Sequence, residues 1–223
     1  LLGADLSKDQ LITVTIDDEK ALLGSIISAD KIGSRSLSSA RVTLTGEGTG
    51  ISVTTQNINW VTSSMYSSAL ATAGVDNARI VVAAPVEVSG TAALAGILKA
   101  YESAASTQLS DEAKAVAGSE MVLTGDLADM IGSDDAVELL AMVKNAIAEY
   151  HLDDYDSLRP YVEQGAKQLG VQLTEDQIDQ ITKLGVQIAK LDLDPDKLAG
   201  QLNGLVDNIQ KIQKVQQSAD SIF

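Results

Sequence analysis

Alternation of apolar and polar residues marks the first third of the chain. Residues 11–16, 41–45 and 51–54 each place an apolar side chain at every second position, which is typical of a strand with one buried face. The glycine-rich stretch 46–50 separates the second and third segments, so we predict a β-hairpin there. The uninterrupted apolar run within residues 78–84 indicates a central strand that is covered on both faces.

A helical spacing of three or four residues lies between these strands. The acidic residues 17–19 favour the start of a short helix, because negative charge stabilises a helix N-terminus. Thr62 is a capping residue for a second helix, which Gly74 ends. After Pro85 the strand pattern stops, and Ser89 is placed to cap the next helix. The resulting strand and helix order, βαββαβ, is that of a ferredoxin-like α/β sandwich.

The rest of the chain shows only helical spacing. We predict one helix from residue 110 to about residue 131, with interruptions at Gly118 and Gly125, and another over residues 133–150. Residues 174–177, Thr-Glu-Asp-Gln, form a capping box for a further helix.

A last helix is predicted after Asp194, which caps it ahead of a proline at the first helical position. Its apolar residues follow alternating steps of four and three, at Leu198, Leu202, Leu205, Ile209 and Ile212. Such a 3.5-residue repeat needs a helical partner, which is either another helix of the same bundle or another chain.

These patterns predict an α+β protein of two domains. Residues 1–108 are expected to form an α/β sandwich with a small mixed β-sheet, and residues 109–223 an all-helical bundle. Hydrophobic residues make up 45% of the chain but aromatic residues only 3%, so we expect cores built from Leu, Ile, Val and Ala.

Charge and residue usage exclude several classes of function. A net charge of -15 repels nucleic acid and anionic lipid surfaces. The absence of cysteine excludes disulfides, thiolate nucleophiles and cysteine-ligated metal sites. The single histidine, His151, excludes a histidine-based metal site and leaves any catalytic triad dependent on this one residue. No stretch approaches the roughly 20 apolar residues of a transmembrane helix.

Two aspartate groups resemble cation-binding loops. Residues 192–196 have the carboxylate spacing of a calcium loop, but Lys197 and Asn203 stand where that loop has its glycine and its bidentate glutamate. Residues 153–156 contain three more aspartates. Helix caps and solvated turns explain both groups, so we predict no metal site and no cofactor.

Topology predicts one candidate site. The strands before and after the helix that starts at Thr62 should be parallel, so their carboxyl ends share one edge of the sheet. The strand pattern slips near Gln56, where we expect a bulge. We predict that a polar or anionic ligand binds at this edge, through Asn57, Asn59, Trp60, Thr62, Ser89, Gly90 and Thr91. The alternative is that Trp60 belongs to the core and that Ser89 and Thr91 are helix caps.

Several motifs carry a resemblance to a known family. They are Asn57-Ile58-Asn59-Trp60, Met65-Tyr66, Thr72-Ala73-Gly74, Val88-Ser89-Gly90-Thr91-Ala92-Ala93-Leu94 and Lys99-Ala100-Tyr101-Glu102. Over about residues 11–200 the chain resembles the YpuA-like family, secreted or surface proteins of Gram-positive bacteria with a domain of unknown function. Members carry a signal peptide and a helix before the first strand, and this chain starts at the end of that helix. The resemblance implies an exported protein, and it implies no catalytic residue. A removed signal peptide would explain the missing start, and an arbitrary cut in the sequence would explain it equally well.

Two classes of function follow. The first is a noncatalytic binding or assembly module of the cell envelope, with a protein, a peptide or a cell-wall ligand as its partner. The second is a carboxylate- or serine-dependent hydrolase that acts on envelope material, which requires perturbed acids in one pocket or an activated Ser89. No Gly-x-Ser-x-Gly motif surrounds Ser89. We therefore predict no catalytic residue and favour the first class, with the oligomeric state left open.

Overall fold

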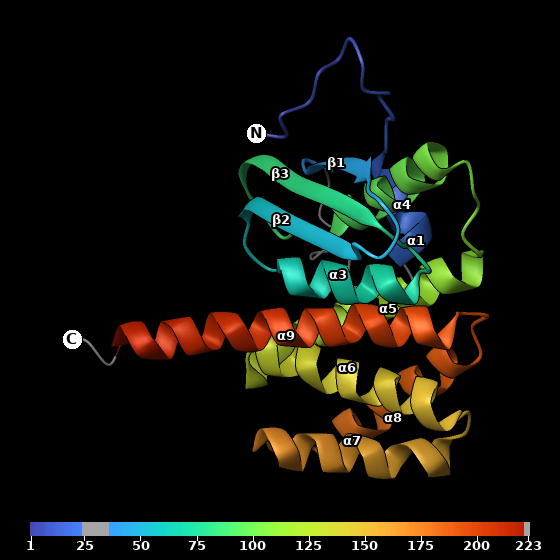
Figure 1. The fold of residues 1–223 in the computed structure, drawn as a ribbon, viewed down its shortest axis with the longest axis vertical. Coiled ribbons are helices and arrows are strands. Elements are labelled where there is room, and N and C mark those ends of the chain that lie inside the picture. Colours follow the sequence, from blue (N-terminus) through green and yellow to red (C-terminus); the bar gives the residue numbers. More distant parts are fainter. Residues whose placement is uncertain (24–35, 221–223) are drawn as a thin grey trace. The chain divides into compact units, whose positions relative to one another are not determined.

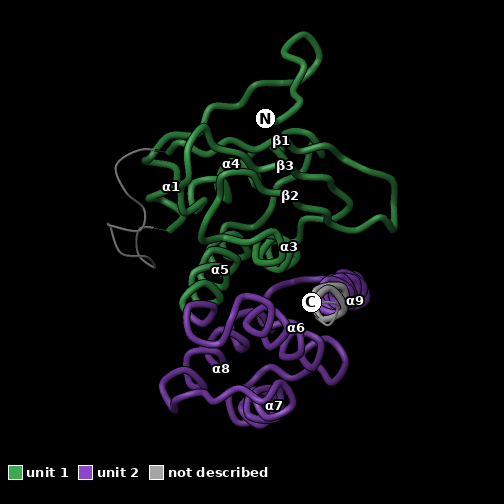
Figure 2. Tube along the Cα trace, turned by 90° about the vertical axis from the view of Figure 1, so that its left-hand side faces the viewer, with its two compact units in different colours: residues 1–126 green, residues 127–223 purple. Residues whose placement is uncertain are grey.

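The computed structural model describes residues 1–23 and 36–220, with side chains up to residue 214 (Figure 1). The chain forms two compact units, residues 1–126 and residues 127–223 (Figure 2). The first unit holds a small mixed sheet and helices, and the described residues of the second form helices only, which confirms the predicted α+β class with a helical C-terminal part. Helix α5 (Asp111–Ile131) runs from the first unit into the second, and the domain boundary at residues 108/109 stays a prediction.

A three-stranded sheet organises the first unit. Its elements are α1 (Ile16–Leu23), β1 (Ser39–Leu44), β2 (Ile51–Ile58), α3 (Ser63–Thr72), β3 (Ala78–Val88) and α4 (Thr91–Ala105). Strand β3 lies between β1 and β2, antiparallel to β1 and parallel to β2 (Figure 1). Helix α3 packs against β2, and α4 packs against β1. β3 is the central strand, as its apolar run predicts, but the predicted cover on both faces is incomplete, because Arg79 is exposed and Val81 half-buried.

The predicted β-hairpin is wrong, although both of its strands form. β1 and β2 do not pair with each other, because β3 is inserted between them. Ile80 and Val82 of β3 are fully buried, whereas every residue of β1 and β2 is half-buried or exposed. The most apolar strand therefore takes the central place, and the two mixed strands form the edges.

The first predicted strand, residues 11–16, is also wrong. Residues 11–15 have no regular structure, and Ile16 begins α1. Thr15 and Asp18 bond each other reciprocally: the Thr15 backbone N–H donates to Asp18 Oδ2 over 2.8 Å, and the Asp18 N–H donates to Thr15 Oγ1. Thr15 is thus held as a helix cap, which ends the extended segment early. With this strand missing and the hairpin absent, the ferredoxin-like order is only partly realised.

Strand β3 continues three residues past Pro85, so the predicted end of strand structure at this proline is wrong. Gln56 of β2 pairs with Ala83, whereas Ile58 pairs with Val88, which leaves residues 84–87 without a partner residue on β2. Proline lacks an N–H, and in this unpaired stretch its absence removes no ladder bond. The same register shift confirms the bulge predicted near Gln56.

The two helices of the sandwich begin differently. Thr62 caps α3 as predicted, because its hydroxyl accepts the Met65 N–H over 3.2 Å. The predicted cap at Ser89 is wrong. Gly90 occupies the N-cap position of α4 with a positive φ of 94° and makes no side-chain cap bond. All structure described beyond α4 is helical or irregular.

Helix α5 is continuous, so the interruptions predicted at Gly118 and Gly125 are wrong. Both glycines are buried. A Cβ atom built at Gly125 would lie 2.3 Å from the ring of Trp60, so this position has no room for a side chain. The glycine weakens the helix by about 1 kcal/mol relative to alanine, and the close contact with the indole offsets that cost.

The second unit is a helical bundle in which α6 is central. It contains α6 (Ser133–Tyr150), α7 (Tyr155–Leu169), α8 (Glu175–Ala189) and α9 (Pro195–Asp220), and α6 packs against the other three. The capping box at Thr174 is confirmed, as is the cap at Asp194, which accepts two backbone N–H groups. Helix α9 buries three residues of its 3.5-residue repeat within its own bundle: Leu198, Leu202 and Ile209.

Helix α7 was not predicted. Pro160 lies inside it and removes one helical N–H, which obscures the pattern. The helix forms because Asp154 caps it, accepting the Ser157 N–H over 3.0 Å, and because it buries residues at a spacing of four, namely Leu158, Val162 and Ala166. Asp154 is therefore a cap. In the described part of the chain, no group of three His, Cys, Asp or Glu residues is suited to a metal ion.

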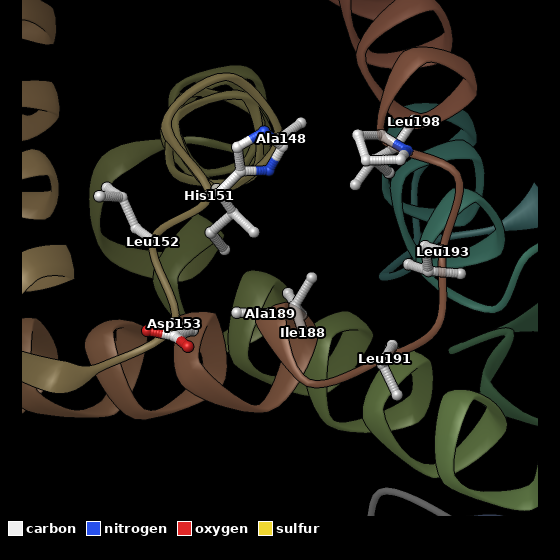
Figure 3. Close-up of a pocket in the computed structure, with 11 residues that line it drawn as sticks. Ala148, His151, Leu152, Asp153, Ile188, Ala189, Leu191, Leu193 and Leu198 are labelled. Atoms are coloured by element: carbon white, nitrogen blue, oxygen red, sulfur yellow. The ribbon is translucent and has the colours of Figure 1, made fainter.

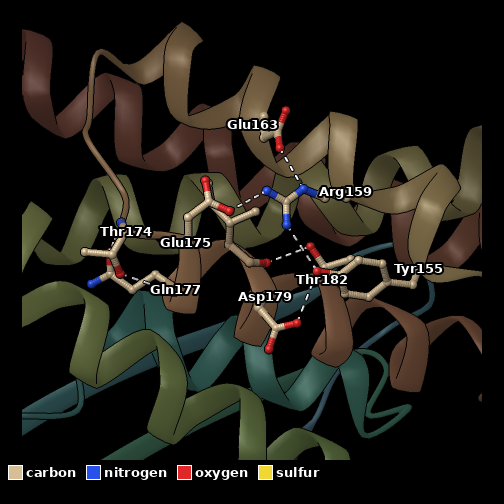
Figure 4. A network of polar contacts seen from close by, with 9 residues as sticks. Tyr155, Arg159, Glu163, Thr174, Glu175, Gln177, Asp179 and Thr182 are labelled. Carbon is tan, nitrogen blue, oxygen red and sulfur yellow. Dashed lines mark hydrogen bonds and ion pairs between the residues drawn. The ribbon is translucent and has the colours of Figure 1, made fainter.

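Polar contacts connect α7 to α8 (Figure 4). Arg159 on α7 donates to Glu175 on α8 over 2.7 Å and to Glu163 over 2.8 Å. The Tyr155 hydroxyl donates to Asp179 over 3.1 Å. Hydrogen bonds to Glu175 and then to Tyr155 hold the pKa of Arg159 above its usual value. One guanidinium thus bonds groups on both helices.

Candidate functional site

The predicted sheet edge exists, but its polar groups bond to the chain itself. Because β2 and β3 are parallel, their carboxyl ends meet, as expected. Asn57, whose φ is 58°, donates its side-chain amide to the Ala84 carbonyl over 2.8 Å. The Asn59 backbone N–H donates to Val88, and that of Val61 donates to Ser89, both over 3.0 Å. Backbone pairing therefore closes this edge.

The remaining predicted site residues have separate structural contacts. Trp60 lies against Gly125 of α5, and Thr62 caps α3. Gly90 is buried and its carbonyl accepts the hydroxyl of Tyr66. Asn57, Asn59, Ser89 and Gly90 lie together at this edge. Trp60 instead contacts Gly125, and Thr62 bonds the Met65 N–H. Ligand binding at these residues stays a prediction.

The sequence did not reveal the buried environment of Glu19. The acidic run 17–19 is typical of an exposed first turn, yet the Glu19 side chain is fully buried. It accepts the Thr91 hydroxyl over 2.6 Å and the Ser36 hydroxyl over 2.9 Å. A buried carboxylate needs such donors, so Glu19 joins α1 to the start of α4. Its role is structural.

A groove of about 510 Å³ lies in the first unit beside β1. The irregular N-terminal segment, including residues 8–14, lines one part of it, residues 38–42 line a second, and α4 contributes a third. The α4 residues are all small: Ala92, Ala93, Gly96, Ala100 and Ala104. The volume falls within the range of about 300 to 1,000 Å³ that is usual for ligand pockets.

The backbone of β1 offers hydrogen-bonding groups to this groove. The Thr45 N–H donates to the Asn77 carbonyl directly opposite, over 3.0 Å. In an antiparallel ladder, bonded and non-bonded pairs alternate, so Arg41 and Thr43 direct their N–H and C=O groups to β3. Ala40 and Val42, which line the groove, therefore direct theirs to the outer edge. No described residue pairs with this edge as a strand.

The basic side chains described at the groove form ion pairs with nearby acids. Arg41 forms an ion pair with Asp9 at 3.1 Å and donates to the Gly3 carbonyl over 2.8 Å, and Lys8 forms an ion pair with Asp5 at 3.0 Å. Leu6 and Leu11, which also line the groove, are 77% and 78% exposed. The site thus combines open backbone groups with apolar side chains and paired charges. Such a surface can bind an extended chain.

Sequence reasoning missed this groove, although two signals were present. Alanine and glycine recur every fourth residue along α4, at positions 92, 96, 100 and 104, which creates a face without bulk. The segment 11–15 alternates like a strand but lacks a strand partner in the described structure. Neither signal defines a groove until β1, α4 and the N-terminal segment are placed in space.

A second cavity, of about 260 Å³, lies in the second unit, where α6 and α8 end and α9 begins (Figure 3). Its lining is aliphatic except for His151 and Asp153. His151 ends α6 in a left-handed conformation, with a φ of 53°. Figure 3 shows its ring at the rim, with Leu198 on the other side of the opening. Asp153 is the only acid among the described residues that line this cavity.

The chain is therefore an α+β protein of two units, with a groove beside an edge strand as its candidate site. The DUF1002 family model, described as a protein of unknown function, matches residues 1–205, so the chain belongs to this family. It is similar to the uncharacterized protein YpuA of Bacillus subtilis (strain 168), with 38% identity over 226 residues that cover 94% of this chain and 78% of that protein. These findings confirm the family resemblance. No solved structure matches the chain.

Proposed function

We propose that this protein is a noncatalytic binding or assembly module of the cell envelope and that the groove beside β1 is its binding site. The observation that carries the proposal is the groove itself, about 510 Å³ in volume and lined by small side chains, an open strand edge and exposed leucines. A protein, a peptide or a cell-wall fragment is the expected ligand.

The lining of both cavities favours binding over hydrolysis. A carboxylate-dependent hydrolase needs two acids that converge on the substrate. Among the residues that the structure describes, Asp9 is the one acid that lines the groove, and Asp153 is the one acid that lines the second cavity. Ser89 lies near the hydroxyl of Thr91 at 3.4 Å, a neighbour that is no general base.

We further propose that the protein is exported, in agreement with an envelope function. The composition avoids cysteine, whose thiols are a liability outside the cell, and the net charge of -15 disfavours nucleic acid as a partner. The described residues contain no helix whose length and hydropathy suit a bilayer crossing. We propose that the protein acts in the envelope, where peptides and wall polymers are within reach.

A thermal-shift screen tests this function. The probes are soluble cell-wall fragments and short synthetic peptides, and a ligand that binds the folded state raises the melting temperature. Gly96→Leu fills the floor of the groove, because a Cβ at Gly96 meets only Val14, at 3.7 Å. Gly204→Leu is the control, since no atom lies within 4 Å of a Cβ at that exposed helical position.

We expect at least one probe to raise the melting temperature of the wild-type protein and of Gly204→Leu, and to lose this effect with Gly96→Leu. A probe that shifts all three proteins equally binds elsewhere, and such a result contradicts the assignment of the groove. Hydrolysis of a wall fragment, detected by release of reducing ends or new amines, would instead support the enzyme hypothesis.

A further inference from the structure

We infer that the ligand of this groove is an extended peptide that adds to β1 as a fourth strand. This inference rests on the proposed binding function and specifies its ligand. Three features of the groove carry it: the spacing of the open backbone groups, the small side chains of α4, and the charge of the molecule.

The open backbone groups have the spacing of a strand partner. Ala40 and Val42 direct their N–H and C=O groups to the outer edge of β1, and they are two residues apart. Two residues of an extended strand span about 6.7 Å, the repeat with which a neighbouring strand presents its own groups. A peptide laid along β1 therefore meets a donor and an acceptor at every second residue. Main-chain bonds of this kind supply affinity without dependence on sequence.

The small α4 residues on the floor of the groove determine which side chains of a bound peptide fit. Directly paired residues of a sheet point to the same face, so Ala40 and Val42 share the face of the buried residues Val82 and Ile80. Helix α4 packs against β1, and its residues Leu94, Ile97 and Leu98 are buried as Ile80 and Val82 are, so we place α4 on this face. An added strand would direct every second side chain toward Ala92, Gly96 and Ala100, where small residues leave room. We expect apolar residues at those alternate positions.

The charge of the protein restricts the composition of the peptide further. The cations that line the described part of the groove, Lys8 and Arg41, already form ion pairs with Asp5 and Asp9. The whole chain carries a net charge of -15, which repels acidic peptides. Neutral or basic peptides that alternate apolar and small polar residues fit the site. Proline is disfavoured because it donates no ladder bond.

The test uses a heptapeptide copied from residues 10–16, Gln-Leu-Ile-Thr-Val-Thr-Ile, because this stretch is neutral and alternates. Two variants of the peptide carry backbone N-methyl groups, one at the odd and one at the even positions. In an added strand only one set of N–H groups faces β1. We expect one variant to lose affinity at least about tenfold and the other to keep it, since the hydrogen bonds to Ala40 and Val42 are lost together. Titration followed by NMR measures both affinities.

Hydrogen exchange of the protein gives an independent readout. The amides of Ala40 and Val42 should exchange at least about tenfold more slowly when the peptide is bound, whereas those of Arg41 and Thr43, already bonded to β3, should change little. Equal effects of the two N-methyl variants, or no protection at Ala40 and Val42, would overturn strand addition.

The outcomes separate this inference from the proposed function. If the peptide fails to bind at millimolar concentration while a wall fragment binds in a manner sensitive to Gly96→Leu, the binding function stands and strand addition is wrong. If Ala40 and Val42 become protected with rising protein concentration alone, as the protein sediments as a dimer, the occupant is a second copy of this chain and the peptide assignment is wrong. If no probe binds the groove at all, both fail.

Discussion

Gly90 stands where β3 passes into α4, and its backbone and its surroundings both require glycine. Its φ of 94° is strained for any residue with a side chain. A Cβ there would lie 2.5 Å from the Ile58 methyl group and 2.5 Å from the Tyr66 hydroxyl. Tyr66 is itself fixed, since it is fully buried and its hydroxyl bonds to the Gly90 carbonyl. Ile58 of β2 and Tyr66 of α3 thus both depend on the missing side chain of Gly90.

Gly90→Ala should destabilise the protein by about 2 to 4 kcal/mol, because overpacking of about 1 to 3 kcal/mol adds to about 1 kcal/mol of backbone strain. Gly48→Ala is the matched control. Its φ is 78°, but no atom lies within 4 Å of a Cβ there, so only the strain of about 1 kcal/mol is expected. Urea denaturation measures both changes. Equal losses of stability in the two variants would show that the side chains around Gly90 move aside at little energetic cost.

Asp18 gives the first unit a defined response to acid. The hydrogen bond from Lys99, followed by bonds from the backbone and side chain of Thr15, lowers the pKa of Asp18 from 3.8 to about 2. A carboxyl whose pKa falls on folding stabilises the folded state above its unfolded pKa and loses this effect as pH falls. The window runs from about pH 4 down to about pH 2.

Asp18→Asn should therefore reduce stability near neutral pH and flatten the loss between about pH 4 and pH 2. Denaturation midpoints measured in steps across this range test the prediction. Asp17→Asn is the control, because its side chain is an exposed neighbour on the same helix turn. If the variant at Asp18 loses stability on acidification as steeply as the wild type, the Lys99 contact has no part in the acid response.

At the scale of elements, helix ends are set by local bonds. Thr174 accepts the Gln177 N–H through its hydroxyl over 3.3 Å, and the Gln177 side chain accepts the Thr174 N–H over 2.7 Å. The Gln177 N–H also reaches the Thr174 carbonyl, over 3.1 Å, whereas the Gln177 side chain supplies the acceptor for the Thr174 N–H. Helix α8 begins there whatever surrounds it. The strands lack such signals, since their partners lie far along the chain.

Thr174→Ala should cost about 0.5 to 2 kcal/mol, the usual cost of losing a capping side chain. Thr174→Ser keeps a hydroxyl and should cost much less. Because Thr174 is exposed, the loss of packing is small and the difference reports the cap. Urea unfolding followed by circular dichroism measures it. A serine variant as weak as the alanine variant would contradict the cap as the source of stability.

For the whole molecule, excess negative charge is the dominant long-range force. The chain has 31 acidic and 16 basic residues. The excess negative charges repel one another most strongly in the compact folded state, where they lie closest together. Salt screens charges over a length that falls to about 10 Å at 0.1 M. The folded state should therefore gain more from added salt than the unfolded chain does.

Raising sodium chloride from about 0.01 M to about 0.3 M should raise the melting temperature, because screening relieves this repulsion. Scanning calorimetry at several salt concentrations measures the rise. Glu47→Lys reduces the imbalance at an exposed loop position and should show a smaller rise. A melting temperature that falls with salt would mean that ion pairs such as those of Arg159 outweigh the repulsion.

Much of the fold followed from the sequence where the decisive contacts are local. The caps at Thr62, Thr174 and Asp194 were predicted and are confirmed. The bulge near Gln56 is confirmed as well, because a phase slip in a strand is visible within a few residues. Helix α7 was missed because Pro160 masks the spacing of its buried residues.

The candidate groove followed less well, because it depends on residues far apart in the chain. The sheet edge with Asn57 and Ser89 was predicted from topology, and the strands do run parallel there. The sequence did not show which backbone groups would stay unpaired at that edge. In the structure, the backbone N–H groups of Asn59 and Val61 form hydrogen bonds across it. The groove beside β1 required knowledge that β3 separates β1 from β2.

The sequence by itself determined the α+β class, the family, the central place of β3 and most helix starts, because periodicity and capping are written in neighbouring residues. Tertiary structure alone decided which strands pair and which edge remains open. A strand forms its hydrogen bonds with whichever strand packs beside it, and burial of Ile80 and Val82 favoured β3 between two mixed strands. The edge of β1 that no described strand covers, and with it the proposed peptide site, results from that choice.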